Sequence, residues 1–206
     1  SWADYDRKLI SRGGGIFERT AKSIALTPEI KALTGFAEET VTPDALLKAL
    51  LTADIDLLWF GGIGAYIKAS TQSHADVGDK ANDILRVDGK DLRAKVIAEG
   101  ANLGVTQAGR IEFARLGGRI NTDAIDNSAG VDSSDHEVNI KILTTEAISE
   151  GALKAADRNS LLASMTDEVG HLVLENNYDQ TRALSVMQAT AAAGDRRHGV
   201  HRGRTQ

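Results

Sequence analysis

The chain has 206 residues, of which 42% are hydrophobic and only 4% are aromatic, and its 24 Lys and Arg residues stand against 29 Asp and Glu residues. The net charge of -5, with both signs mixed along the chain, argues against a dedicated nucleic-acid-binding protein, and no apolar run approaches the roughly 18 residues of a membrane span. The lack of cysteine excludes disulfides, thiol nucleophiles, zinc ribbons and iron–sulfur ligation.

The length and the first residues bear on organisation and location. Domains commonly have about 150 residues, so this length suits one large domain or a domain with an appended helical piece. The start of the chain lacks the basic and then apolar order of a signal peptide, and a cytoplasmic protein is therefore expected. The chain opens with Ser1 and not with Met, which is typical of a piece cut from a longer polypeptide.

Two short helices are predicted near the start of the chain. Thr27 and Thr42 each offer a hydroxyl that can cap a helix, and each is followed by a proline, which is favoured at the first helical position. The first helix is expected to end at Gly35. The second carries leucines at positions 46, 47, 50 and 51, whose spacing lines one apolar face.

Three runs, 55–60, 95–98 and 119–125, are predicted to be strands. The first two are apolar and read as strands buried on both faces, whereas the third is more polar and reads as an edge strand. Thr106 can cap a helix between the second and third runs. A strand, a helix and a strand in this order predict a parallel βαβ unit with a right-handed crossover.

The second half of the chain reads as helical. The polar segment 70–91 shows a helical pattern only around residues 81–85. Three residues, Ser133, Ser134 and Asp135, can cap a helix that runs to about Ser149. Apolar residues from Leu161 to Val173 form an amphipathic stripe, and a last helix is predicted over 178–193. The fold class predicted from these patterns is α/β, with helices closing the C-terminal end.

The candidate chemistry lies where the strands end. In open parallel sheets, ligands bind beyond the carboxyl ends of the strands. Here those ends carry Gly61 and Gly62, then Asn102, and then Asn127. Glycine lets a flat ring or a ribose approach the backbone, and an amide side chain both donates and accepts a hydrogen bond, which suits a nicotinamide. The alternative is that these glycines only make tight turns.

An acidic cluster raises a metal-binding alternative. It consists of Asp126, Asp132, Asp135, His136 and Glu137. Hard cations take carboxylate oxygens, but this spacing matches no common ligand pattern. Acidic groups in the first turn of a helix are explained by its positive N-terminal end, so no metal is predicted.

Several stretches resemble glutamate dehydrogenases. Residues 95–102, KVIAEGAN, with Thr106 shortly after, resemble a strand and loop of the cofactor domain of that family, and 127–131, followed by Ser134, resemble its next strand end. Further stretches resemble the large, NAD-specific bacterial subclass: 4–17, 57–64 and 132–141. The similarity extends from Trp2 to about Leu184.

This resemblance implies a fold and a reaction. The fold is an incomplete Rossmann-type parallel sheet with C-terminal helices: residues 1–150 belong to a partial dinucleotide-binding domain and 151–194 to a helical segment. The basic residues 195–206 do not resemble the family and read as a disordered tail. The reaction is the oxidative deamination of L-glutamate to 2-oxoglutarate and ammonia with hydride transfer to NAD, a step in amino-acid catabolism.

The resemblance also assigns binding residues. Gly61 and Gly62 would lie along the nicotinamide ribose, and Asn102 would hydrogen-bond near it. Asn127 would meet the nicotinamide carboxamide or the substrate, and Ser134 would bind the distal carboxylate of glutamate. Such groups act by positioning the substrate and the cofactor, and none of them needs to titrate. No residue of this chain is assigned a catalytic role.

The departures from the family limit what the chain can do alone. The catalytic lysine and aspartate of the family belong to a preceding substrate domain, and the glycine-rich dinucleotide fingerprint is also missing. The isolated chain is therefore expected to be inactive and to need the preceding part of its polypeptide, and a homo-oligomer is expected for the full protein. Two alternatives stay open: a related amino-acid dehydrogenase, and a non-catalytic domain that binds a nucleotide or a partner. The choice of NAD over NADP rests on the subclass resemblance alone.

Overall fold

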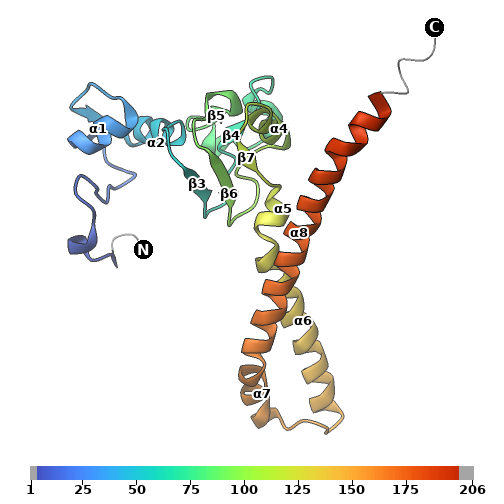
Figure 1. Ribbon diagram of the computed structural model, residues 1–206. Helices are drawn as coiled ribbons and strands as arrows, with labels where there is room; N and C mark the ends of the chain where they lie inside the picture. The colour runs from blue at the N-terminus through green and yellow to red at the C-terminus, as the bar shows by residue number, and fades with distance from the viewer. Residues whose placement is uncertain (1–3, 200–206) are drawn as a thin grey trace. The chain divides into compact units, whose positions relative to one another are not determined.

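The chain divides into two compact units, Ser1–Asp126 and Asn127–Gln206. The computed structural model describes residues 4–199. The first unit combines helices with short strands, and the second is helical over the residues described (Figure 1). The predicted α/β fold class, with helices toward the C-terminal end, is confirmed. The predicted domain limits at residues 150 and 194 stay predictions, because compactness alone does not define a functional domain.

Two capped helices lie near the start of the first unit. Helices α1 (Pro28–Thr34) and α2 (Pro43–Leu51) begin at the two predicted prolines. The hydroxyls of Thr27 and Thr42 accept hydrogen bonds from N–H groups three residues further on, both at 3.2 Å. Gly35 ends α1 in the left-handed conformation, with a φ of 79°. Both helix predictions are confirmed.

A small antiparallel pair of strands flanks α1. The strands are β1 (Ile24–Ala25) and β2 (Thr40–Val41), and the 3-10 helix η2 (Arg7–Leu9) precedes them. Three buried residues form the core of this part: Ile24, Leu26 and Leu46. This small core, against which Ile30 of α1 also packs, holds α1 and α2 together in the part of the chain that precedes the main sheet.

A three-stranded parallel sheet is the centre of the first unit. In spatial order its strands are β3 (Leu57–Phe60), β6 (Val96–Glu99) and β7 (Arg119–Ile120). Helix α4 (Gln107–Arg115) connects β6 to β7, and the Thr106 hydroxyl caps it by accepting a 3.1 Å hydrogen bond from the Gly109 N–H. Figure 1 shows β3 and β6 side by side. The predicted βαβ unit is confirmed.

Two of the strand predictions need correction. Strand β3 is not buried on both faces, because Leu57 and Trp59 are 53% and 61% exposed while Phe60 is buried. Leu57 and Trp59 lie on one face of β3, which is exposed, whereas Leu58 and Phe60 lie on the opposite, better buried face. Strand β7 is an edge strand, as predicted, but it ends at Ile120, and residues 123–125 of that run belong to helix α5 (Asp123–Asp126).

The exposed edge of β3 is expected to make the isolated chain self-associate. An unpaired strand edge offers backbone N–H and C=O groups to a second copy, and Leu57 and Trp59 add apolar surface. In sedimentation velocity we expect species larger than a monomer that grow with concentration. Replacing Leu57 and Trp59 together by Lys should weaken this association by about tenfold or more. A compact monomer over a wide concentration range would contradict the expectation.

The sequence pattern gives no sign of a second parallel pair of strands. It consists of β4 (Ile67–Lys68) and β5 (Val87–Asp88). Three one-turn helices lie beside it: α3 (His74–Val77), η3 (Lys80–Asn82) and η4 (Gly89–Asp91). The helical pattern predicted around 81–85 is met only by η3. The pair matters for the site because β4 lies against the start of α4, through a bridge between Ile67 and Val105.

The main hydrophobic core joins both parallel pairs to α4. Its buried members are Phe60, Ile67, Val87, Ile97, Val105 and Phe113. Because these side chains come from β3, β4, β5, β6, α4 and, with Val105, the loop before α4, they hold the strand ends and the start of α4 in one arrangement. The loops that follow β3 and β6 therefore begin at strand ends that are fixed by a close-packed core.

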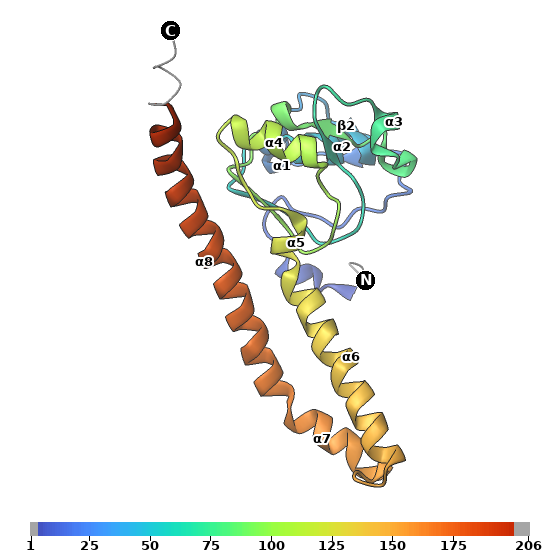
Figure 2. The ribbon, with the colours of Figure 1, turned by 90° about the vertical axis from the view of Figure 1, so that its right-hand side faces the viewer.

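The second unit is a helical hairpin. Its elements are α6 (Ser128–Ser149), η5 (Ala155–Asp157), α7 (Arg158–Ser164) and α8 (Thr166–Gly199). Figures 1 and 2 show α6 and α8 side by side, with α7 at the turn. Helix α6 begins at Ser128, so the predicted capping positions 133–135 are wrong and lie inside the helix. Helix α8 also continues through the break predicted before residue 178.

The C-terminal residues and the helix lengths complete the description. Helix α8 reaches Gly199, so it includes residues 195–199 of the predicted tail, whereas 200–206 lie outside the described residues. None of the helices over residues 4–199 is at once long and apolar enough to cross a bilayer.

Candidate functional site at the carboxyl ends of β3 and β6

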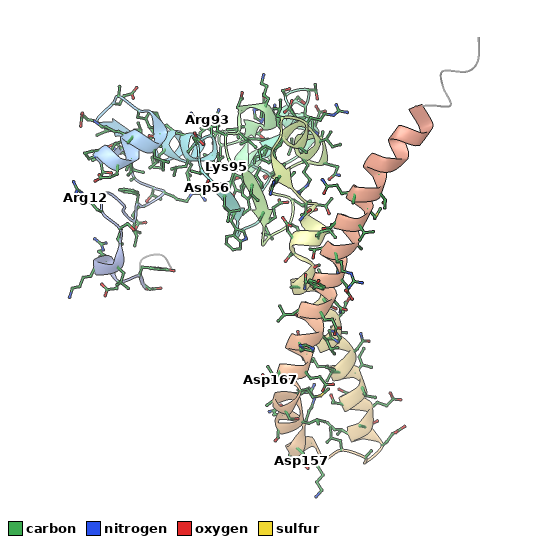
Figure 3. The ribbon with its side chains drawn as sticks, viewed as in Figure 1. Arg12, Asp56, Arg93, Lys95, Asp157 and Asp167 are labelled. Atoms are coloured by element: carbon green, nitrogen blue, oxygen red, sulfur yellow. The ribbon has the colours of Figure 1, made fainter. Side chains whose placement is uncertain are left out.

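The two ends of the β3–β6 pair differ in chemistry. At the amino ends, the Lys95 ammonium donates a 2.6 Å hydrogen bond to Asp56, and both side chains are exposed (Figure 3). This bond and the charge attraction raise the pKa of Lys95 and lower the pKa of Asp56. An exposed ion pair of this kind contributes little to stability. The carboxyl ends carry glycines and amides instead, and ligands bind at such ends in parallel sheets.

The loops that follow β3 and β6 lie next to each other. The last residues of the two strands, Phe60 and Glu99, are paired in register. Beyond them, the backbone N–H groups of Gly100 and Ala101 both donate to the Phe60 carbonyl, at 2.8 and 3.1 Å. The structure therefore brings the segment that begins at Gly61 together with the loop that carries Asn102.

The glycines of these loops differ in how much space surrounds the position that a Cβ atom would occupy. A Cβ at Gly61 would meet the indole of Trp59 at 2.5 Å, and a Cβ at Gly100 would also collide with that ring. Contact with the Trp59 ring is therefore one reason for glycine at these two positions. A Cβ at Gly62 would meet nothing within 4 Å, and its φ lies outside the left-handed range. Neither packing nor backbone conformation requires glycine there, which favours a ligand that approaches the backbone.

A cavity of about 570 Å³ opens beside these loops. This volume lies within the range of small-molecule sites. Ile63 and Leu103, the residues that follow Gly62 and Asn102, line it. Its polar wall is formed by Asp79, Asn82, Thr106, Gln107, Arg110 and Asp123. Gly62 and Asn102 each directly precede a residue of the cavity wall, and three charged side chains, Asp79, Arg110 and Asp123, line the cavity.

A buried charge sits directly under the loop after β6. The Glu99 carboxylate is 1% exposed and forms an ion pair with Arg110, whose second contact is Asp123 at 3.6 Å. Burial raises the pKa of Glu99 above its ordinary value, and the Arg110 guanidinium opposes this without cancelling it. Glu99 was not among the residues predicted to form the site. The one available signal was an acidic residue at the end of an otherwise apolar strand.

A second carboxylate ties α4 to the loops around it. Desolvation disfavours the charged form of Glu112, but hydrogen bonds from the Ser70 hydroxyl, the Ser70 N–H and the Lys90 N–H outweigh it. The pKa of Glu112 therefore lies below its ordinary value. This group fixes the start of the polar segment 70–91 and does not face the cavity.

The remaining predicted residues belong to the second unit. Asn127 directly precedes α6, and Ser134 lies within α6, where its exposed hydroxyl donates to the Gly130 carbonyl at 3.0 Å. Their proximity to the β3–β6 edge stays a prediction. Ser128 is buried, and its hydroxyl contacts the Asn177 side chain, which gives it a structural role.

The acidic cluster has a different explanation from the one predicted. Helix α6 begins at Ser128, so Asp132, Asp135 and Glu137 lie beyond its first turn and do not complement its positive end. Asp132 instead accepts a 2.9 Å hydrogen bond from the Asn176 amide on α8. Over residues 4–191, whose side chains are described, no group of three or more His, Asp or Glu side chains is arranged to hold a metal ion.

These features define an α/β unit with parallel crossovers and a ligand-accessible carboxyl edge, consistent with an incomplete Rossmann-type fold. The family described as bacterial NAD-glutamate dehydrogenase, catalytic domain, matches residues 1–187. The chain therefore belongs to this family, and the resemblance found in the sequence is confirmed.

Three relatives show how much of such a protein the chain covers. It is 62% identical over 191 residues to the NAD-specific glutamate dehydrogenase of Pseudomonas aeruginosa. It is 54% identical to those of Halomonas elongata and Mycobacterium tuberculosis, over 194 and 199 residues. These alignments cover 93 to 94% of the chain, but the chain spans only about 12% of the length of each relative.

Proposed function

We propose that this chain supplies the nicotinamide-facing part of the cofactor domain in an NAD-dependent glutamate dehydrogenase. The reaction is the oxidative deamination of L-glutamate to 2-oxoglutarate and ammonia, a step in amino-acid catabolism. The observation that carries the proposal is the β3–β6 edge, where the open position at Gly62 and the loop of Asn102 meet in a sequence of this family. The relatives are named NAD-specific, which supports NAD as the cofactor.

The residues act by holding reactants in place. NAD, when bound, accepts the hydride. Gly61 and Gly62 leave room along the nicotinamide ribose, and Asn102 hydrogen-bonds near that ribose. Asn127 orients the carboxamide or the substrate, and the Ser134 hydroxyl donates to the distal carboxylate of glutamate. Hydride transfer requires the two reacting carbons to be close and aligned, so positioning of this kind contributes directly to the rate.

The proposal extends to the whole protein. We infer a cytoplasmic enzyme that works as a homo-oligomer, with the catalytic lysine and aspartate on another part of the polypeptide. This chain contributes binding surface and no proton-transfer group. It is expected to give no NAD-dependent turnover of glutamate alone.

The proposal is tested by comparing two glycines in the complete enzyme. Gly62→Ala places a methyl group where the ribose would lie and should raise the KM for NAD by about tenfold. Gly170→Ala is the matched control, because a Cβ there also meets nothing within 4 Å but lies on α8. NADH formation from glutamate is measured for both variants and for the 206-residue chain alone.

Three results would count against the proposal. The complete wild-type enzyme could fail to reduce NAD with glutamate. The chain alone could turn over glutamate, or Gly62→Ala could leave the KM for NAD at the value of the Gly170→Ala control.

A further inference from the structure

The loop 100–105, between β6 and α4, contains a residue in an unfavourable conformation. Leu103 has a φ of 69°, and no other non-glycine residue over 4–199 has a positive φ. A side chain in the left-handed region is strained and persists only where its surroundings enforce it. Burial of the Leu103 side chain does not supply this force, because it is 64% exposed. The backbone of the loop must therefore be held by other contacts.

Two carboxylates, the buried Glu99 and the partly exposed Asp123, hold the second half of the loop. The Leu103 N–H donates to Asp123 at 3.1 Å, and the Val105 N–H donates to Glu99 at 3.1 Å. Gly104 lies between these donors, and a Cβ there would meet Oε1 of Glu99 at 2.6 Å. Close approach of the carboxylate to the loop therefore requires glycine at this position.

Arg110 joins the two carboxylates. Its guanidinium is paired with Glu99 and lies 3.6 Å from Asp123, and it donates a 2.8 Å hydrogen bond to the Asn121 carbonyl. Among the described residues, no hydrogen-bond donor other than this guanidinium meets Oε2 of Glu99. We call Glu99, Arg110 and Asp123 the charge clamp.

The charge clamp is costly to bury. Glu99 and Arg110 are 1% and 5% exposed, and two charges removed from water are often replaceable by apolar side chains without loss of stability. Packing alone therefore does not account for these residues. Glu99 and Asp123 instead supply a pair of acceptors for the Val105 and Leu103 N–H groups, which apolar side chains cannot provide, and Arg110 lies between these two carboxylates.

Asn102 lies between two fixed points of the loop. The Gly100 and Ala101 N–H groups bind the Phe60 carbonyl on one side, and the charge clamp holds Leu103 and Val105 on the other. We propose that the charge clamp positions Asn102 for the nicotinamide ribose, so that these three residues are positioning residues for the cofactor. This inference rests on the proposed function.

The test uses the complete enzyme and two measurements, the steady-state KM values and the Kd of NADH by fluorescence titration. Glu99→Gln keeps the size of the side chain but removes the charge that pairs with Arg110. It should raise both the KM for NAD and the Kd of NADH by about tenfold, and leave the KM for glutamate within about twofold. Arg110→Lys, which keeps the charge and loses the planar fork, should give a smaller rise.

A paired apolar variant separates positioning from stability. Glu99→Leu combined with Arg110→Leu removes both charges at once, so it should lower the unfolding temperature less than Glu99→Leu alone, which leaves the buried Arg110 without its partner. Its Kd for NADH should nevertheless rise as in Glu99→Gln, because the loop has lost an acceptor. Asp88→Asn is the control, since it breaks the ion pair with Lys68 on the β4–β5 pair without touching the loop.

The possible results distinguish a failure of the charge-clamp proposal from a failure of the proposed function. Equal NADH Kd values for the wild type, Glu99→Gln and Asp88→Asn overturn the clamp, whether or not the enzyme oxidises glutamate. A wild type that binds NADH without oxidising glutamate overturns the proposed function and leaves the clamp to be judged on the Kd values. A wild type that binds no NADH overturns both. If Glu99→Gln does not fold, Arg110→Lys decides the same question.

Discussion

Replacing Arg86 by methionine is expected to lower the free energy of unfolding of the chain by about 2 to 4 kcal/mol, because a buried guanidinium that donates to two backbone carbonyls and to Asp83 would be lost. The Arg86 side chain is 0% exposed. Its Nε donates to the Ala65 carbonyl at 2.7 Å, and its Nη2 donates to the Asp79 carbonyl at 2.6 Å. Its Nη1 donates to Asp83 at 2.5 Å and lies 2.9 Å from His74 Nδ1. Methionine fills part of the space but leaves all four partners without this donor.

The consequence reaches the candidate site. Ala65, Asp79 and Asn82 line the 570 Å³ cavity, and Arg86 ties the first two to β5. Loss of the guanidinium should therefore loosen this wall as well as destabilise the fold. Because the partners lie on β4, α3 and η3 or beside them, the effect should spread over the polar segment 70–91.

Urea denaturation followed by circular dichroism measures the change. Arg93→Met is the matched control: Arg93 is an exposed arginine whose Nε donates to the Thr52 carbonyl at 2.8 Å (Figure 3). It should cost no more than about 1 kcal/mol. A loss below about 1 kcal/mol for Arg86→Met, similar to that of Arg93→Met, would show that the network does not hold the fold.

Elements defined by local signals could be predicted from the sequence. The caps at Thr27, Thr42 and Thr106 are confirmed because a cap depends on a few neighbouring residues. Strands β4 and β5 were missed for the opposite reason. Each has only two residues, too few to show a period, and they pair across 20 residues of chain.

Burial was harder to predict than element type. The apolar run of β3 indicates burial on both faces, yet burial of a strand depends on what lies beside the sheet. Leu57 and Trp59 share one face of β3, and that face remains exposed. The start of α6 was placed too late because Ser133, Ser134 and Asp135 are good capping residues, whereas the helix begins at Ser128 without a side-chain cap.

The position of the candidate site could be predicted, but its internal charges could not. The rule that ligands bind at the carboxyl ends of parallel strands leads to Gly62 and to the loop of Asn102, and the structure brings these two segments together. The pair of Glu99 and Arg110 depends on how α4 folds back over β6. A single charged residue in a sequence does not reveal its partner, so only the folded chain identifies the clamp.

Ser134→Asp in the complete enzyme is expected to raise the KM for glutamate by about a hundredfold, which corresponds to about 2.7 kcal/mol. If the Ser134 hydroxyl donates to the distal carboxylate of glutamate, aspartate replaces the donor by a like charge. Ser134→Ala removes only the hydrogen bond to a charged group and should raise this KM by about tenfold to a hundredfold. The KM for NAD should change little in either variant.

Ser134 is suited to this test because its substitution disturbs little else. It lies well inside α6, is exposed, and donates only to the Gly130 carbonyl of its own helix. Ser133→Asp is the control, because Ser133 is the preceding residue of α6, is also exposed, and points to a different side of the helix. A similar rise in the glutamate KM for both variants would assign the effect to negative charge on α6. An unchanged KM in Ser134→Asp would remove Ser134 from the substrate site, whereas a rise confined to position 134 would place its hydroxyl at the carboxylate.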